Sequence, residues 1–260
     1  MNGLAAALGP CALVCAAAGA ACVPAPALPY ELPAGPAGLA VWRQARSELE
    51  ALRRRARPAT GYKMEVVVDF EHRPSGTHQR ARGAVAVGSD ALRMILLGPG
   101  GTTALDVWMC RDAFRMSVPA ADLEVRGTLH DEPERLRALP VGFLGYWFLR
   151  PYAGSLLAFV PDGALRRFVL RDGDAVVDVR LEPGPAGAPE RVTLRRRAPS
   201  GEELFTSDGA SCGAVRYREE DVGLELAVEC LGLDRDAELP EAAFADPDDP
   251  ERACAAEMEP

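Results

Sequence analysis

The sequence predicts an α+β domain in which an antiparallel β-sheet curls over helices, and two observations lead to this prediction. Apolar and polar residues alternate along many short segments, and glycine or proline separates consecutive segments, as antiparallel hairpins require. Helical patterns are confined to one segment before the strands and one insert between them. Apolar residues form 48% of the chain and charged residues 26%, which is typical of a globular protein.

The N-terminal segment has the features of an export signal, because residues 1–30 contain no charged side chain and are rich in alanine. The sequence Ala18-Gly19-Ala20-Ala21-Cys22 resembles a bacterial lipobox, in which the cysteine becomes the lipid-bearing first residue. We predict a lipoprotein signal peptide over residues 1–22 and lipidation of Cys22. The alternatives are a cleaved secretory signal and an uncleaved anchor, since the apolar run is long enough to span a bilayer.

Composition divides the rest of the chain into a tether, one domain and a tail. Residues 23–38 are rich in proline, alanine and glycine and predict a semi-extended tether. Residues 39–245 are expected to form one domain, and residues 246–260 an acidic disordered tail. Ten acidic residues and two arginines lie from Asp234 to the C-terminus, so this end carries -8 of the net charge of -9. Because the body is almost neutral and lacks a basic field, we expect no nucleic-acid partner.

A helix is predicted directly after the tether. Its apolar residues are three and four positions apart and therefore share one stripe: Trp42, Ala45, Leu49, Leu52 and Ala56. Arginines at positions 53–55 suit the negative end of the helix dipole, and Pro58 ends the helix.

The strands are predicted from apolar and polar residues that alternate with a period of two. In the first strand, Tyr62, Met64, Val66, Val68 and Phe70 alternate with charged residues, including Lys63, Glu65 and Asp69. Further strands are expected around Val85 and Val87 and over residues 92–97, 103–110, 166–170, 175–181, 191–195, 204–207, 214–218 and 223–231. Together with the first-strand set, the residues expected to face one interior are Met94, Leu96, Leu105, Val107, Leu224, Leu226 and Val228.

The strand pattern breaks between residues 128 and 159. A helix is expected to begin at Asp131 and to end at Pro140, with acids and a proline in its first turn. The next segment, Val141 to Leu149, is the most aromatic in the chain.

One segment resembles a known family. Residues 93–105, with the sequence RMILLGPGGTTAL, resemble the strand–Gly-Pro-x-Gly–strand segment of LolB, in the LolA/LolB family of outer-membrane lipoprotein carriers and receptors. The preceding helix, the strand at residues 83–87 and the aromatic insert follow in the matching order, so the resemblance covers about residues 40 to 181.

The resemblance implies a half-open antiparallel β-barrel of about ten to eleven strands, with an N-terminal helix and a helical insert covering its concave face. It also implies a hydrophobic cavity for acyl chains, with these lining residues: Tyr62, Met64, Val66, Val68, Phe70, Met94, Leu96, Leu105, Val107, Phe143, Trp147 and Phe148. The protein is then a monomeric, lipid-anchored lipoprotein on the periplasmic face of the outer membrane, and its cargo is an acyl chain or the lipid moiety of a lipoprotein.

The loop Gly98-Pro99-Gly100-Gly101 departs from the family pattern. In the receptor, the residue between proline and glycine is apolar and exposed and helps to insert cargo into the membrane, whereas here it is Gly100. The insertion step is therefore not expected of this chain.

A structural or scaffolding lipoprotein is the alternative, in which the aromatic insert fills the cavity. Phe143, Trp147 and Phe148 distinguish the two, since they either line an open groove or plug it. We expect no enzyme, catalytic residue, metal or cofactor. Residues 209–213 fit Gly-x-Ser-x-Gly, but all three histidines precede Ser211 and a strand-like segment follows it, against the hydrolase pattern.

Four cysteines remain in the predicted mature domain, namely Cys110, Cys212, Cys230 and Cys254, and they allow two disulfides in three connectivities. Cys212 and Cys230 are the favoured pair because they lie on sequence-adjacent strands. The alternative for Cys230 is a buried free thiol on the apolar face of its strand.

Overall fold

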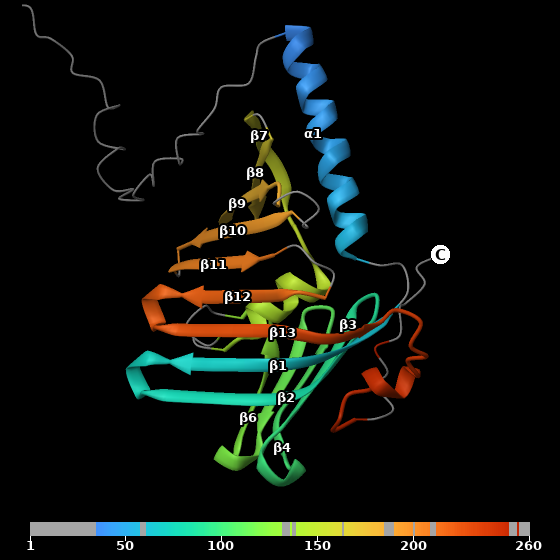
Figure 1. Ribbon diagram of the computed structural model, residues 1–260, viewed down its shortest axis with the longest axis vertical. Helices are drawn as coiled ribbons and strands as arrows, with labels where there is room; N and C mark the ends of the chain where they lie inside the picture. The colour runs from blue at the N-terminus through green and yellow to red at the C-terminus, as the bar shows by residue number, and fades with distance from the viewer. Residues whose placement is uncertain are drawn as a thin grey trace, which may run out of the picture. The chain divides into compact units, whose positions relative to one another are not determined.

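A sheet of thirteen antiparallel strands dominates the part of the chain that the structure describes (Figure 1). This computed structural model describes residues 35–57, 61–131, 136, 139–162, 164–184, 190–199, 201–208, 212–249 and 254. The predicted signal peptide, Cys22, most of the tether and Ser211 lie outside these residues, as does most of the helix predicted from Asp131 to Pro140.

The strands form two meanders. The first comprises β1 (Tyr62–His72), β2 (Thr77–Val87), β3 (Ala91–Leu97), β4 (Thr103–Cys110), β5 (Ala113–Val118) and β6 (Leu123–Thr128). The second comprises β7 (Ser155–Asp162), β8 (Leu165–Asp172), β9 (Ala175–Glu182), β10 (Arg191–Ala198), β11 (Gly201–Ser207), β12 (Ala214–Glu219) and β13 (Leu224–Asp234). They join where β1 pairs with β13, which leaves β6 and β7 as the two edges of an open sheet.

The open antiparallel sheet agrees with the predicted class, but the prediction of ten to eleven strands is wrong. The strands that were not predicted are β5, β6 and β7. Arg115 in β5 and Arg126 in β6 interrupt the apolar pattern of those short segments. β7 contains the continuous run Leu156-Leu157-Ala158-Phe159 rather than an alternation, and most of it lies in the region 128–159, in which the sequence predicts no strand.

Burial in the sheet follows the predicted alternation. In β1, Met64, Val66 and Val68 are buried, whereas Lys63 and Glu65 are exposed. The corresponding interior residues of the other strands are also buried: Met94, Leu96, Val107, Leu224, Leu226 and Val228. Tyr62, Phe70 and Leu105 are partly buried and pack against the same core. The interior of the sheet is therefore the face that the period of two indicates.

The helix α1 (Gly35–Ala56) begins at residue 35, three residues before the predicted end of the tether at residue 38. Its stripe buries Ala45, Leu49 and Leu52, as the spacing predicts. Its last turn is held by Arg53, whose guanidinium donates hydrogen bonds to the carbonyl oxygen of Tyr152 at 3.0 and 2.8 Å and to that of Gly154. This contact fixes the end of α1 to the segment that precedes β7.

The aromatic insert lies between the two meanders and is helical, as predicted. It consists of α3 (Val141–Leu144) and a π-helical turn, η5 (Gly145–Leu149). Phe143 is completely buried, with its ring centroid 5.8 Å from that of Phe205 on β11 and 5.2 Å from that of Tyr217 on β12. The insert therefore packs on the inner side of the second meander. Single 3₁₀ turns connect other elements: η2 (Arg73–Ser75), η3 (Pro99–Gly101), η4 (Pro119–Ala121) and η6 (Glu220–Val222).

Residues 246–249 and 254, which belong to the predicted acidic tail, make specific contacts with the first meander. After β13 the chain forms η7 (Glu241–Phe244). The Nε1 of Trp108 donates a hydrogen bond to the carbonyl oxygen of Phe244 at 2.8 Å. Asp246 is 2% exposed and accepts two hydrogen bonds from Arg126, at 3.0 and 2.9 Å. The acids of this segment are thus used as partners for arginines on β5 and β6.

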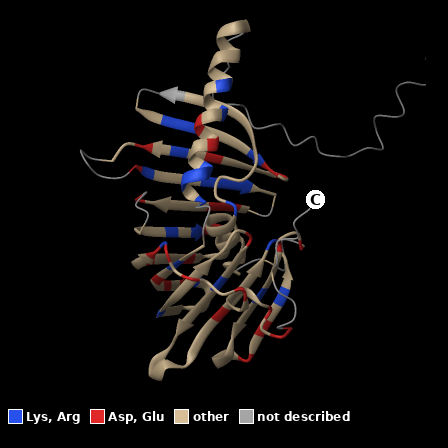
Figure 2. Cartoon of the chain, turned by 90° about the vertical axis from the view of Figure 1, so that its right-hand side faces the viewer, with Lys and Arg blue, Asp and Glu red and all other residues tan. Residues whose placement is uncertain are grey.

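Two disulfides are present among the described cysteines. One joins Cys212 to Cys230, the pair that the sequence favoured. The other joins Cys110 at the end of β4 to Cys254 and fastens the C-terminal segment to the first meander. In the view of Figure 2, basic and acidic residues are interspersed along the strands and form no single basic field.

Candidate functional site

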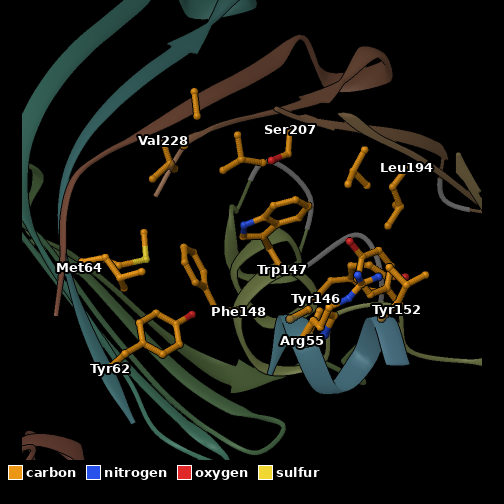
Figure 3. A pocket seen from close by; sticks show the side chains of 18 of the residues that line it. Arg55, Tyr62, Met64, Tyr146, Trp147, Phe148, Tyr152, Leu194, Ser207 and Val228 are labelled. Carbon is orange, nitrogen blue, oxygen red and sulfur yellow. The ribbon is translucent and has the colours of Figure 1, made fainter. Parts of the chain in front are cut away.

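A cavity of about 430 Å³ lies on the inner side of the sheet. Its walls come from the last turn of α1, the insert, the segment that follows the insert, and strands β1, β10, β11, β12 and β13. Figure 3 shows Trp147 and Phe148 of the insert between Met64 and Val228 on one side and Leu194 on the other. The volume is within the range of small-molecule sites in proteins, toward its lower end.

The lining is mainly apolar. It includes these aliphatic and aromatic side chains: Leu52, Ala56, Met64, Trp147, Phe148, Pro151, Val192, Leu194, Val215, Val228 and Leu233. Leu194 is 1% exposed and Val228 is 1% exposed, so the strand side of the wall belongs to the core. Such a surface favours an apolar ligand, because about 0.8 kcal/mol accompanies the burial of each methylene group.

Four of the twelve predicted cavity residues line this cavity, namely Tyr62, Met64, Trp147 and Phe148. The other predicted residues lie elsewhere in the interior: Val66, Val68, Phe70, Met94, Leu96, Leu105, Val107 and Phe143. Seven of these lie in the first meander and pack against neighbouring side chains. The cavity is therefore displaced from the position that the sequence predicted, toward the second meander and α1.

Phe143 fills the interior instead of lining the cavity. It belongs to a cluster with Phe148, Phe205 and Tyr217 in which the Phe205 and Tyr217 ring centroids are 5.1 Å apart. The hydroxyl of Tyr217 lies 3.0 Å from a carboxylate oxygen of Glu203, which also pairs with Arg196 at 2.6 Å. The insert thus plugs one part of the concave face and lines the wall of the part left open.

A second, more polar cavity of about 180 Å³ lies beside this plug and shares Tyr146 with the first. Tyr146 is 5% exposed, and burial raises the pKa of its hydroxyl well above the usual value. Among the residues that the structure describes, this hydroxyl has no hydrogen-bond partner. Tyr146 therefore forms a polar position in the wall between the two cavities.

Tyr152 adopts a left-handed backbone conformation, with φ of 57°, which is uncommon for a bulky residue. It is 8% exposed and its side chain lines the cavity. Its carbonyl oxygen is the one that accepts two hydrogen bonds from Arg53. Unusual backbone conformations of this kind persist where the surrounding contacts determine them, and they are frequent at binding sites.

The wall residues that the sequence did not predict include Arg55 in α1, Tyr152 after the insert, Val192 and Leu194 in β10, and Arg235 after β13. The alternation of Val192 and Leu194 with polar residues could have identified the strand contribution. The remaining residues have no local signal, because only the packing of α1 and the segment after β13 brings them to the cavity.

The loop between β3 and β4 is built around glycine. Gly100 and Gly101 have φ of 75° and 79°, a region that side-chain-bearing residues rarely adopt. Pro99, Gly100 and Gly101 are exposed, as is Leu97 just before the loop, at 46%. The loop contributes no residue to the cavity.

Within the described ranges, no helix combines the length and the apolar character that spanning a membrane requires. In the same residues, no three histidine, cysteine, aspartate or glutamate side chains gather as metal ligands would.

Neither a protein-family model nor a curated protein matches this sequence. Solved structures to which the chain is similar include a LolA superfamily protein from Nitrosomonas europaea, with 11% identity, a TM-score of 0.49, and coverage of 78% of this chain and 97% of that chain. A DUF1329 family protein from Desulfovibrio piger shows 11% identity and a TM-score of 0.41, covering 77% and 96% of the two chains.

A putative outer membrane lipoprotein-sorting protein domain from Vibrio parahaemolyticus shows 12% identity and a TM-score of 0.41, covering 77% of this chain and 94% of that chain. Since these TM-scores lie below 0.5, the function has to be argued from the cavity itself.

Proposed function

We propose that this protein is a lipid-handling lipoprotein of the bacterial envelope whose cavity binds an alkyl chain of a lipid or of a lipoprotein. The observation that carries the proposal is an apolar cavity of about 430 Å³ that the protein's own side chains leave open. Its predominantly aliphatic and aromatic wall can bind a chain through burial alone. The resemblance of residues 93–105 to LolB is consistent with this role.

The cavity has room for roughly fourteen groups of about 30 Å³ each, the volume of one water molecule in the liquid and close to that of a methylene group. This supports the binding of one alkyl chain at a time.

Displacement of a fluorescent fatty acid from the purified protein measures chain binding. Ala56 lines the cavity from α1, so Ala56→Trp fills part of it and should weaken binding at least tenfold, or about 1.4 kcal/mol. Ser47 is exposed on the same helix and lines no wall of the cavity, so Ser47→Trp should leave the affinity unchanged. Equal affinities of the two variants would contradict the assignment of the cavity.

We also propose that the chain is anchored through lipidated Cys22 to the periplasmic face of the outer membrane. Stable anchoring requires two acyl chains or more on that residue. Mass spectrometry of the N-terminal peptide from the native membrane should show an acylated Cys22. An unmodified N-terminus at Ala25 or beyond, or an intact Met1, would exclude the anchor.

A non-catalytic scaffolding lipoprotein is the second candidate, and the burial of Phe143 in the aromatic cluster favours it, because part of the concave face is self-filled. Lipid extraction of the purified protein separates the two. Lipid that co-purifies stoichiometrically supports lipid handling, whereas lipid-free protein that displaces no fatty acid probe supports scaffolding.

A further inference from the structure

The rim of the cavity carries two arginines that come from different elements. Arg55 belongs to the last turn of α1, and Arg235 follows β13. Both side chains line the cavity, and both residues are exposed. Within the described residues, neither guanidinium makes a hydrogen bond or an ion pair, whereas the neighbouring Arg53 and Arg57 both have partners. The two positive charges are therefore available to a ligand.

Tyrosine hydroxyls accompany both arginines. Burial raises the pKa values of Tyr62 and Tyr152 to about 12, with a further raising contribution from the charge of Glu190 at Tyr152, and the nearby charges of Arg235 and Arg55, respectively, act in the opposite direction. Both hydroxyls therefore remain protonated at neutral pH and can donate hydrogen bonds. Figure 3 shows the hydroxyl of Tyr62 directed toward the space beside Phe148.

The acidic residue in the wall does not cancel this charge. Glu190 lines the cavity, but its carboxylate is already paired with Arg166 on β8. Arg55 and Arg235 thus leave an excess of positive charge at the mouth of an otherwise apolar cavity. Arginine donates planar, paired hydrogen bonds that match carboxylate and phosphate oxygens.

We propose that the cavity selects a single-chain amphiphile with an anionic head group, a carboxylate or a phosphate monoester, which pairs with Arg55 or with Arg235 while its alkyl chain occupies the apolar interior. This inference rests on the proposed function and adds the charge of the ligand to it. Unlike an acyl chain joined to a neutral glyceride, such a ligand carries its charge at the end of the chain.

The test compares four ligands with the same chain, namely myristate, tetradecyl phosphate, tetradecanol and tetradecylammonium. Each displaces a fluorescent probe from the full chain carrying Cys22→Ala, which removes the proposed anchor and changes no described residue. We expect myristate or tetradecyl phosphate, or both, to bind at least tenfold more tightly than tetradecanol, and tetradecylammonium to bind most weakly. The stronger of the two anions identifies the head group.

The double variant Arg55→Gln/Arg235→Gln should lose this preference for anions while retaining its affinity for tetradecanol. The matched control is Arg54→Gln/Arg216→Gln, at exposed positions outside the cavity, and it should retain the preference. Circular dichroism verifies that both double variants are folded.

Equal binding of myristate, tetradecyl phosphate and tetradecanol to the parent protein would overturn the anionic selectivity and leave chain binding intact. A parallel loss of affinity for tetradecanol in Arg55→Gln/Arg235→Gln would also overturn it, because the arginines would then shape the cavity instead of recognising charge. Failure of all four ligands to bind would instead refute the proposed function.

Discussion

The side chain of Arg53 on α1 holds the backbone of Tyr152, a residue that lines the cavity. The left-handed backbone of Tyr152 costs roughly 1–3 kcal/mol. The three hydrogen bonds that Arg53 donates to the carbonyls of Tyr152 and Gly154 offset this cost. One residue of α1 thus determines where an aromatic wall residue lies, although Arg53 itself does not line the cavity.

Arg53→Ala should lower the free energy of unfolding by about 1.5–3 kcal/mol, because it removes charged donors from two carbonyl oxygens. Urea denaturation measures the loss. Arg54→Ala, at the exposed neighbouring position, should change stability by less than about 0.5 kcal/mol. Similar values for the two variants would show that the contact of Arg53 does not support the fold.

Stability is expected to depend on pH in opposite directions through the buried Asp178 and the partly buried Asp106. The side chain of Asp178 on β9 is 6% exposed, and Arg167 contacts it at 2.8 and 2.5 Å. Burial alone would raise its pKa, but the hydrogen bonds and charges of Arg167 and the charge of Arg180 outweigh burial and lower the pKa below 3.8. For Asp106 on β4, burial, together with the charge of Asp248, prevails over Arg93 and Arg115 and raises the pKa. Among the described residues its Oδ1 has no hydrogen-bond partner.

The lowered pKa of Asp178 means that its stabilising contribution is present above the unfolded-state pKa of about 3.9 and is lost as pH falls through the folded-state value. Asp178→Asn should therefore cost about 2–3 kcal/mol at pH 7. The difference in free energy of unfolding between this variant and the parent should decrease as the pH falls below about 4.

The contribution of Asp106 to the free energy of unfolding changes with pH in the opposite direction to that of Asp178. Its folded-state pKa is raised, so its contribution is present at low pH and is lost as pH rises through the folded-state value. The stability gap between the parent and Asp106→Asn should narrow with rising pH. Urea titrations at a series of pH values test both residues, and parallel curves for the two variants would contradict the assignment.

At the scale of elements, the segment after β13, residues 235–249 and 254, is a strap across β4, β5 and β6, on the face of β4 that carries Trp108, opposite Val107 and Met109. It covers Trp108, which is 3% exposed, and supplies the acids that pair with Arg115 and Arg126. The Cys110–Cys254 disulfide closes it over a separation of 144 residues, compared with 18 for Cys212–Cys230.

In the chain-entropy model, these separations correspond to about 5 and about 3 kcal/mol of stabilisation, respectively. Cys254→Ser should therefore destabilise the protein more than Cys230→Ser does. It should also shift tryptophan fluorescence toward the red, because loosening of the strap exposes Trp108, and Cys230→Ser should cause no such shift. If Cys254→Ser and Cys230→Ser destabilise the protein equally and neither shifts the tryptophan fluorescence, other contacts hold the strap in place without the Cys110–Cys254 disulfide.

The elements that could be predicted are those in which one pattern repeats over enough residues. α1 and β1 show clear periods of three to four and of two, and their buried faces follow these periods. β5 and β6 could not be predicted, because Arg115 and Arg126 interrupt their apolar pattern. The partners of these arginines include Asp246 and Asp248 from the distant strap as well as Glu124 on β6.

That the cavity is lined by apolar side chains could be predicted from the sequence, but its position in the fold could not. Met64 and Val66 share one face of β1, yet only Met64 lines the cavity, since other side chains fill the space beside Val66. Alternation identifies the inward residues of a strand. It does not tell which inward positions remain unfilled, because that depends on the volumes of side chains on several other elements.

At the scale of the whole molecule, the β3–β4 loop separates this protein from a LolB receptor. An apolar residue at position 100 would have to adopt the left-handed region that Gly100 occupies, at a cost of roughly 1–2 kcal/mol. The chain should therefore fail to rescue growth of a strain depleted of LolB, even in cells in which it reaches the outer membrane. Immunoblotting of the outer-membrane fraction controls for export, and full rescue would show that the loop is not decisive.

The pairing of β1 with β13 has a consequence for the order in which the protein folds. Each of the other ladders joins strands that are consecutive in the chain, so both meanders can grow hairpin by hairpin as their strands become available. The central ladder cannot form until the last strand is available. Until then β1 presents a bare edge that can pair with another chain. We expect the time between the appearance of β1 and that of β13 to be the interval in which this protein depends most on chaperones.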